Sequence, residues 1–337
     1  MIPELALKRA GIVDVAKMAG VSRQTVTRAM NDMPGISADT KSRVLDAART
    51  LGYRPSRFGR GLVKHNTLSL GLVITDLTNP YFADLASSIA KLATDHGWAL
   101  LLMENAPNNK ASIARLRELS LQVDAAIGYF ETDPDTVDDI FGDMPLVTLN
   151  DEFRPGGHAS VDIDFDPGMV RILEHLRSTG RHHVVMVDEP EEGQPSSRAE
   201  SYVRQSIATG LDPEIFSADV DGLAHMQIGV TVADQLLKRE NLPDAVICYN
   251  DAVAIGVLKQ FQLAGIVVPR DCGIVGIDGL AIGTLVTPEL TTLSLDISEV
   301  AASAVDMVVT MLESTHSTSS HDLRRTVTHS LVLRGSA

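Results

Sequence analysis

Four side chains near the amino terminus have the types and spacing needed to bind a nucleic acid. On a helix through this stretch, one outer side presents Arg23, Gln24, Thr27 and Arg28. Arginine and glutamine form paired hydrogen bonds with base edges in the major groove, and threonine and arginine also bind phosphates. This pattern predicts a helix that reads double-stranded DNA.

Residues 12–31 predict two short helices joined by a tight turn, which would hold those side chains in place. Ala16 is small enough for a second helix to cross close by, and Gly20 can adopt the left-handed conformation of the turn. Val26 fills the gap between the helices, and Ser22 is a suitable N-cap for the second one. The alternative is two amphipathic helices of an ordinary bundle.

A third helix is expected over residues 38–51, with Ser37 as its N-cap. Its inner face would carry Val44, Leu45 and Ala48, and Gly52 would end it. Residues 1–55 therefore predict a helix-turn-helix domain. Residues 56–66 form a linker with a weak helical pattern that contains Gly59 and Gly61. Because each glycine disfavours a helix, we expect this linker to be unfolded in the free protein.

Charge is distributed unevenly along the chain. The net charge is −15, but residues 1–64 hold 12 Lys and Arg against 5 Asp and Glu. The remaining residues hold 17 basic and 39 acidic side chains. A basic head on an acidic body predicts phosphate contact at one end of the chain only.

Composition excludes several other classes of protein. The sequence contains no run of 18 apolar residues that would predict a membrane span. The first ten residues have no apolar signal core, so we expect a cytoplasmic, nucleoid-associated protein. The two cysteines, Cys248 and Cys272, lie in apolar, strand-like settings typical of buried thiols, with a disulfide as the less favoured alternative. The His182-His183 pair is a poor chelate, and no metal or other cofactor is expected.

Strand and helix patterns alternate through residues 67–337, which predicts an α/β body. Apolar strands between amphipathic helices indicate parallel sheets covered on both faces. About 270 residues suit two lobes better than one simple core. The expected elements are 68–74, 81–96, 98–103, 110–119, 125–129, 146–149, 168–178, 183–187, 199–209, 229–239, 245–249, 253–264 and 273–277.

Polar side chains follow several of these strands, where parallel sheets bind ligands. One arginine among several Asn and Asp side chains suits a small polar or polyhydroxylated ligand. For Asp76 the alternative is a local turn, and for Asp251 it is a helix cap. The side chains at these positions, which we expect to converge on a ligand-binding cleft, are Asp76, Asn79, Tyr81, Phe82, Asn150, Asp151, Arg198, Asn250, Asp251 and Asp278.

The sequence resembles the LacI/GalR family of bacterial transcription regulators from about residue 11 to its end. The segments that carry the resemblance are 14–28 (DVAKMAGVSRQTVTR), 51–55 (LGYRP), 76–82 (DLTNPYF), 249–256 (YNDAVAIG), 275–278 (VGID) and 290–293 (LTTL). The first segment is highly specific, whereas the others are specific only as a series. The resemblance implies a helix-turn-helix head and a two-lobed body like that of periplasmic binding proteins.

The resemblance also implies a homodimer that binds a near-palindromic operator. Arg23, Gln24 and Arg28 match the family's base-reading positions, and Leu62 matches a hinge leucine that enters the minor groove. The complete expected DNA-contacting set is Ser22, Arg23, Gln24, Thr25, Thr27, Arg28, Asn31, Tyr53, Arg57 and Leu62.

In the body, the resemblance implies three crossovers between the lobes. The first lobe would comprise about 67–167 and 295–322, and the second about 168–293 and 323–337. The resemblance implies effector contacts from Tyr81, Phe82, Asn150, Arg198, Asn250 and Asp278, and the expected effector is a sugar or sugar derivative. Three positions depart from the family's pattern and leave its identity open: Ser201 replaces a favoured glycine, Val220 stands where an aromatic is common, and Asp278-Gly279 lacks a second acidic residue.

Three functions follow from these observations. The leading hypothesis is a repressor whose operator affinity depends on a small-molecule effector, acting either as inducer or as co-repressor. A solute-binding protein would explain the body but not the basic head. An α/β sugar-metabolising enzyme is disfavoured because no phosphate-binding loop or nucleophile elbow occurs in the sequence.

Overall fold

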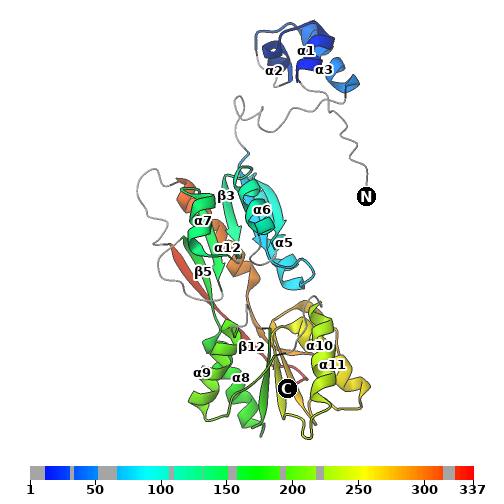
Figure 1. Cartoon of the computed structure of the whole chain (residues 1–337), viewed down its shortest axis with the longest axis vertical. Coiled ribbons are helices and arrows are strands. Elements are labelled where there is room, and N and C mark those ends of the chain that lie inside the picture. Colours follow the sequence, from blue (N-terminus) through cyan, green and yellow to red (C-terminus); the bar gives the residue numbers. More distant parts are fainter. Residues whose placement is uncertain are drawn as a thin grey trace. The chain divides into compact units, whose positions relative to one another are not determined.

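The computed structural model describes residues 12–30, 34–51, 67–105, 110–130, 132–150, 158–189, 195–217, 224–313 and 323–337. The chain divides into two compact units, Met1–Thr67 and Leu68–Ala337. They are called the head and the body below (Figure 1).

The head contains the three expected helices, α1 (Ile12–Ala19), α2 (Arg23–Met30) and α3 (Ala38–Thr50). Gly20 adopts a φ of 67° in the turn between α1 and α2, which confirms the left-handed conformation expected there. Val15, Val26 and Val44 are fully buried, one from each helix, and form the centre of the core. On α3, Ala47 is buried whereas Leu45 is only half-buried. Gly52 lies outside the described residues.

The first lobe of the body is built on a six-stranded sheet in the order β11-β5-β4-β3-β1-β2, with every neighbouring pair parallel. The strands are β1 (Ser69–Ile74), β2 (Ala99–Glu104), β3 (Ala125–Gly128), β4 (Leu146–Asn150), β5 (Ala159–Asp164) and β11 (Arg324–Thr328).

Helices cover both faces of this sheet (Figure 1). Alternate residues of β1 point to opposite faces: Leu72 packs with α5 (Pro80–Asp95) and α12 (Ile297–Glu313), whereas Val73 packs with α6 (Lys110–Ser120) and α7 (Pro134–Phe141). This alternation is the strand period of two, with an apolar layer on each face.

The second lobe contains a sheet in the order β12-β10-β9-β8-β6-β7, in which only the β10–β12 pair is antiparallel. Its strands are β6 (Val184–Asp188), β7 (Glu214–Ser217), β8 (Ala245–Cys248), β9 (Gly273–Asp278), β10 (Thr291–Ser294) and β12 (Ser330–Val332). Helices α8 (Asp166–Ser178) and α9 (Ser197–Thr209) contribute to one hydrophobic cluster, and α10 (His225–Leu236) and α11 (Asp251–Leu263) to another. A short 3-10 helix, η1, spans Ala281–Thr284.

The third crossover lies later in the chain than the sequence analysis places it. The sequence predicts residues 323–337 in the second lobe, but β11 pairs in parallel with β5 of the first sheet. The chain therefore passes between the sheets after Thr328 and enters the second with Ser330. Only Val327 of β11 is buried, so its polar composition hides this edge strand from a search for apolar runs.

Both sheets reverse their winding direction beside an early strand. In the first lobe the reversal falls between β1 and β3, and in the second between β6 and β8. Ligands of such sheets bind outside the carboxyl ends of the strands at these points. The residues that follow β1, β3, β6 and β8 therefore define the candidate site in the body.

Candidate functional site

Helix α2 presents the predicted base-reading side chains at the surface of the head. Ser22 caps the helix, as predicted, because its Oγ accepts the backbone N–H of Thr25 at 3.1 Å. This cap starts the helix at Arg23 and gives Arg23, Gln24 and Arg28 exposed positions on it. Burial of Val26 fixes the rotation of the helix about its axis.

The remaining residues of the predicted DNA-contacting set divide into two groups. The hydroxyls of Thr25 and Thr27 already have contacts within the head: Thr25 Oγ1 lies 2.9 Å from Ser22 Oγ, and Thr27 Oγ1 donates to the carbonyl of Arg23 at 3.1 Å. Asn31, Tyr53, Arg57 and Leu62 lie outside the described residues, as does the linker 56–66.

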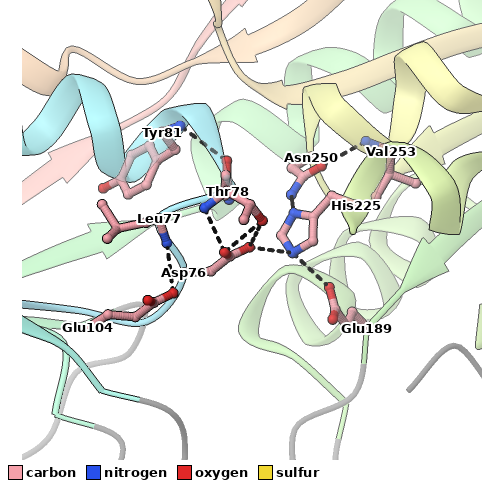
Figure 2. Close-up of polar contacts among 10 residues, drawn as sticks. Asp76, Leu77, Thr78, Tyr81, Glu104, Glu189, His225, Asn250 and Val253 are labelled. Atoms are coloured by element: carbon pink, nitrogen blue, oxygen red, sulfur yellow. Dashed lines mark hydrogen bonds and ion pairs between the residues drawn. The ribbon is translucent and has the colours of Figure 1, made fainter. Parts of the chain in front are cut away.

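In the body, a histidine connects carboxylates that belong to different lobes. His225 is the first residue of α10, and its Nε2 lies 3.5 Å from Glu189 Oε2 and 3.9 Å from Asp76 Oδ2. Asp76 follows β1 of the first lobe, whereas Glu189 follows β6 of the second (Figure 2). We call Asp76, His225 and Glu189 the interlobe bridge.

Asn250 determines which nitrogen of His225 carries the proton. Its Oδ1 accepts the N–H of Val253 at 2.9 Å and caps α11, so its amide nitrogen faces Nδ1 of His225 (Figure 2). Nδ1 must then accept, and the neutral imidazole carries its proton on Nε2. The bridge therefore directs one N–H donor at two carboxylates, an arrangement that hydroxyl groups of a ligand can also satisfy.

Asp76 also stabilises a turn. Its Oδ1 accepts both the N–H and the Oγ1–H of Thr78 at 2.7 Å, as the local interpretation of this residue predicts. Glu104, at the end of β2, accepts the N–H of Leu77 at 3.1 Å in the same turn (Figure 2). These contacts hold the Asp76 carboxylate at the carboxyl edge of the first sheet, facing His225.

Two aromatic rings hold Arg198 in the second lobe. Its guanidinium carbon lies 4.5 Å from the ring centre of Tyr249 and 4.8 Å from that of Phe165. Tyr249 follows β8, and Phe165 connects β5 to α8 at the first crossover. Stacking on aromatic rings orients a guanidinium and leaves its edge for hydrogen bonds.

The start of α9, which carries Arg198, is itself fixed by a buried carboxylate. Asp188, the last residue of β6, accepts the hydroxyl of Ser196 at 2.5 Å and its N–H at 3.1 Å. Ser196 in turn caps α9 by accepting the N–H of Ala199 at 3.2 Å. Through Ser196, Asp188 at the end of β6 therefore fixes the start of α9 and with it the position of Arg198.

A buried histidine completes this stack at the crossovers. His329 lies between β11 and β12, and its ring stacks on Phe165 with centres 4.7 Å apart. Burial, with a smaller effect of the Arg198 charge, lowers the pKa of His329 to about 3. The imidazole is therefore neutral at physiological pH and acts as an aromatic spacer between two crossovers.

The predicted aromatic contacts of the first lobe form a cluster at its carboxyl edge. The hydroxyls of Tyr81 and Tyr129 lie 2.8 Å apart, and Phe82 packs edge-on against both rings. Tyr81 and Phe82 lie in the first turn of α5, and Tyr129 follows β3. This cluster gives the first lobe an apolar wall beside a polar turn, the usual composition of a small-molecule site.

The remaining predicted residues lie at strand ends. Asn150 is the last residue of β4, Asn250 follows β8, and Asp278 ends β9 with a φ of 113°. Asn250 caps α11, so the helix-cap interpretation of Asp251 is wrong. Asp251 instead accepts hydrogen bonds from Leu280 N and Thr292 Oγ1.

Several residues of this site are not among those expected from the sequence. Glu189 and Tyr129 could have been found by the rule that located Asp76, since each follows or ends a recognised strand. His225 was missed because the sequence places the start of its helix at Gly229, four residues too late. Phe165 and His329 lie at crossovers, where no strand or helix pattern identifies a side chain.

Within the described parts of the chain, no cluster of His, Cys, Asp or Glu could hold a metal ion. Cys248 and Cys272 are buried free thiols, and burial raises the pKa of Cys272 to about 12. None of the described helices has the length and apolar character needed to cross a membrane.

Comparisons with known proteins agree with both parts of the structure. Residues 11–56 match the model for bacterial regulatory proteins of the lacI family, and residues 173–337 match that for a periplasmic binding protein-like domain. The chain is 29% identical over 303 residues to catabolite control protein A of Priestia megaterium, covering 88% of this chain and 91% of the relative. It is also 29% identical over 310 residues to the HTH-type transcriptional repressor PurR of Pasteurella multocida, with coverages of 89% and 91%.

A solved structure extends the match to the body. A LacI family transcriptional regulator from Arthrobacter sp. FB24, crystallised in complex with lactose, is 30% identical to this chain with a TM-score of 0.71. The match covers 81% of this chain and all of the other. A regulatory head, a two-lobed binding body and these similarities place the chain in the LacI family of bacterial transcriptional regulators.

Proposed function

We propose that this regulator is a homodimeric repressor whose head binds a near-palindromic operator and whose body binds a small carbohydrate effector. The observation that carries the effector proposal is the arrangement of Arg198 and the interlobe bridge, which lie where both sheets reverse direction. Repression is supported by the similarity to the PurR repressor.

The operator contacts are assigned to the exposed face of α2. Arg23 suits a guanine, because its two donors match the O6 and N7 acceptors. Gln24 and Arg28 read or flank neighbouring base pairs, and Ser22, Thr25 and Thr27 lie beside the phosphates. Asn31, Tyr53, Arg57 and the hinge residue Leu62 complete the set, in a chain divided into a 1–55 head, a 56–66 hinge and a 67–337 body.

The effector contacts are assigned to both lobes. The proposed contacts of the first lobe are Asp76, Tyr81, Phe82 and Asn150, and those of the second are Arg198, Asn250 and Asp278; the bridge adds His225 and Glu189. Carboxylates and an N–H donor beside aromatic rings suit the hydroxyls and the apolar face of a sugar. The lactose complex of the Arthrobacter regulator supports this ligand class.

The proposed mechanism is a change in the balance between two lobe arrangements. An effector that binds both sides of the interlobe bridge favours the closed arrangement and thereby alters the spacing of the two heads in the dimer. Operator affinity then changes by the difference between the effector affinities of the two arrangements. An inducer and a co-repressor differ only in which arrangement holds the heads at the operator spacing.

A thermal-shift screen of the full chain against lactose, other sugars and small metabolites tests the effector proposal. A ligand stabilises the body according to its concentration relative to Kd. We expect a shift with at least one carbohydrate and no shift in Arg198→Ala. Stabilisation by none of them, or an equal shift in the variant, would contradict the proposal.

We also propose that the protein is cytoplasmic and is not an enzyme. Unchanged sugar after prolonged incubation with the chain is the expected result, and turnover would favour an enzyme. Recovery of the chain from a periplasmic fraction would favour a solute-binding protein.

A further inference from the structure

Asp251 carries a buried carboxyl group in the second lobe that neither caps a helix nor faces solvent. It is the first residue of α11 and 0% exposed, and the cap of that helix is Asn250. Its carboxylate accepts Thr292 Oγ1–H and the N–H of Leu280, both at 2.6 Å. Asp251 therefore connects the start of α11 to β10 and to the loop after β9.

A glycine in β9 makes room for this carboxylate. Gly276 of β9 lies opposite Thr292 of β10, and a Cβ on Gly276 would come within 2.0 Å of Asp251 Oδ1. Since no side chain fits at that position, glycine there leaves the space that the carboxylate occupies. This accounts for a glycine inside an otherwise apolar buried strand.

The loop held by Asp251 has an unusual backbone. Asp278 is the one non-glycine residue in the described part of the chain with a positive φ, 113°. Such a conformation is unfavourable and persists only where neighbouring contacts enforce it. Three surround it: Leu295 N–H donates to the Asp278 carbonyl at 3.2 Å, Gly279 N–H to Thr292 Oγ1 at 3.3 Å, and Leu280 N–H to Asp251.

We propose that Asp251 is a positioning residue for effector binding, which holds the loop 278–280 so that Asp278 is presented at the carboxyl edge of the second sheet. Asp251 acts through this loop and does not touch the effector. The inference rests on the proposed function of Asp278 as an effector contact.

The electrostatic surroundings support a functional reason for the charge. Burial raises the pKa of Asp251 to about 6 despite its hydrogen bonds from Thr292 and Leu280. The Arg334 charge attracts the carboxylate and opposes this rise. The carboxylate in turn contributes, after burial, to a raised pKa of the Cys248 thiol. A buried carboxylate that is unfavourable for folding but holds a strained loop beside a ligand site is typical of a site where stability is lost for function.

Amide hydrogen exchange of the full chain, measured without effector at pH 7.5, tests the proposal. In Asp251→Ala we expect peptides covering 278–284 to exchange at least tenfold faster, with peptides from β1 and α5 unchanged. Asp251→Asn keeps one acceptor and should restore part of the protection. Thr292→Val removes the hydrogen bond from β10 to Asp251 and the one from Gly279 to Thr292, so it should also speed exchange of 278–284. This variant keeps the test usable if the alanine variant does not fold.

Asp188→Ala provides a matched control, because it removes a buried carboxylate that also ties a loop to a strand end. It should speed exchange around 196–199 and leave 278–284 protected. Unchanged protection of 278–284 in the Asp251 variants, or an equal loss throughout the body, would overturn the proposal.

A second arm tests the link to the effector by calorimetric titration with lactose. Weaker lactose binding in Asp251→Ala, with partial recovery in Asp251→Asn, is expected. Faster exchange of 278–284 with unaltered lactose affinity would overturn the positioning role. A wild-type chain that binds neither lactose nor any other carbohydrate would contradict the proposed function instead, and the exchange result would still decide whether Asp251 holds the loop.

Discussion

Replacement of Asp251 by asparagine should change how the stability of the body depends on pH. The pKa of Asp251 is raised from 3.8 to about 6, chiefly by burial. A shift of about 2 units corresponds to roughly 3 kcal/mol between the neutral and ionised forms. Because its pKa is higher in the folded state, protonation of Asp251 stabilises the folded state. This contribution to the free energy of unfolding is fully present below the unfolded pKa and is lost as pH rises through about 6.

The expected size of the effect follows from those two pKa values. Between pH 8 and pH 5.5, the free energy of unfolding of the wild type should rise relative to Asp251→Asn by about 0.8 kcal/mol. Other titrating groups are shared by the two proteins and cancel in the difference. At pH 8 the variant loses one charged hydrogen-bond acceptor but also a buried charge, so the two proteins should differ by less than about 2 kcal/mol.

Urea unfolding followed by far-UV circular dichroism at several pH values measures this difference. Asp133→Asn is a suitable control, because hydrogen bonds from Thr136 lower the pKa of this exposed carboxyl. The stability it provides is lost only below its unfolded pKa, so its difference from wild type should be flat from pH 5.5 to 8. A flat difference for Asp251→Asn as well, or a fall toward low pH, would refute the reasoning.

Three further predictions concern the binding residues. Arg198→Lys keeps the charge but loses the planar group that stacks on Phe165 and Tyr249, so in calorimetric titration it should weaken carbohydrate binding nearly as much as Arg198→Ala. Full carbohydrate affinity in Arg198→Lys would show that stacking does not matter. His225→Ala removes the contact between lobes and should increase the radius of gyration of the ligand-free protein in X-ray scattering; an unchanged scattering curve would rule out a closing role for the bridge. Arg23→Ala should relax preference at one base pair in each half-site by about 1–3 kcal/mol in competition binding, and unaltered preference would mean that another residue reads that base.

The sequence predicts the three described helices of the head because their signals are local. Ser22, Gly20 and Val26 each specify one contact within a few residues, and all three behave as predicted. The buried strands of the body are also predicted, since apolar runs flanked by helices have few other interpretations.

The elements that escape prediction are those whose burial depends on distant parts of the chain. Strand β11 is mostly polar and becomes a strand only by pairing with β5, some 160 residues earlier. The same limit applies to the site: Asp76 and His225 come from different lobes, and only the folded chain brings them together. The sequence leaves Asp251 with two interpretations, a helix cap or a cleft residue, because it shows the neighbours of Asp251 in α11 but not Thr292.

Selection of binding sites from random duplex DNA by the full chain, followed by fluorescence anisotropy of the selected site, tests the central claim most directly. We predict a near-palindromic consensus, affinity that falls steeply as salt rises, and loss of the consensus in Arg23→Ala. Adding a carbohydrate that stabilises the body should shift the affinity of the wild type but not that of Arg198→Ala. Enrichment of no symmetric sequence, or binding that is insensitive to both salt and Arg23, would contradict the account.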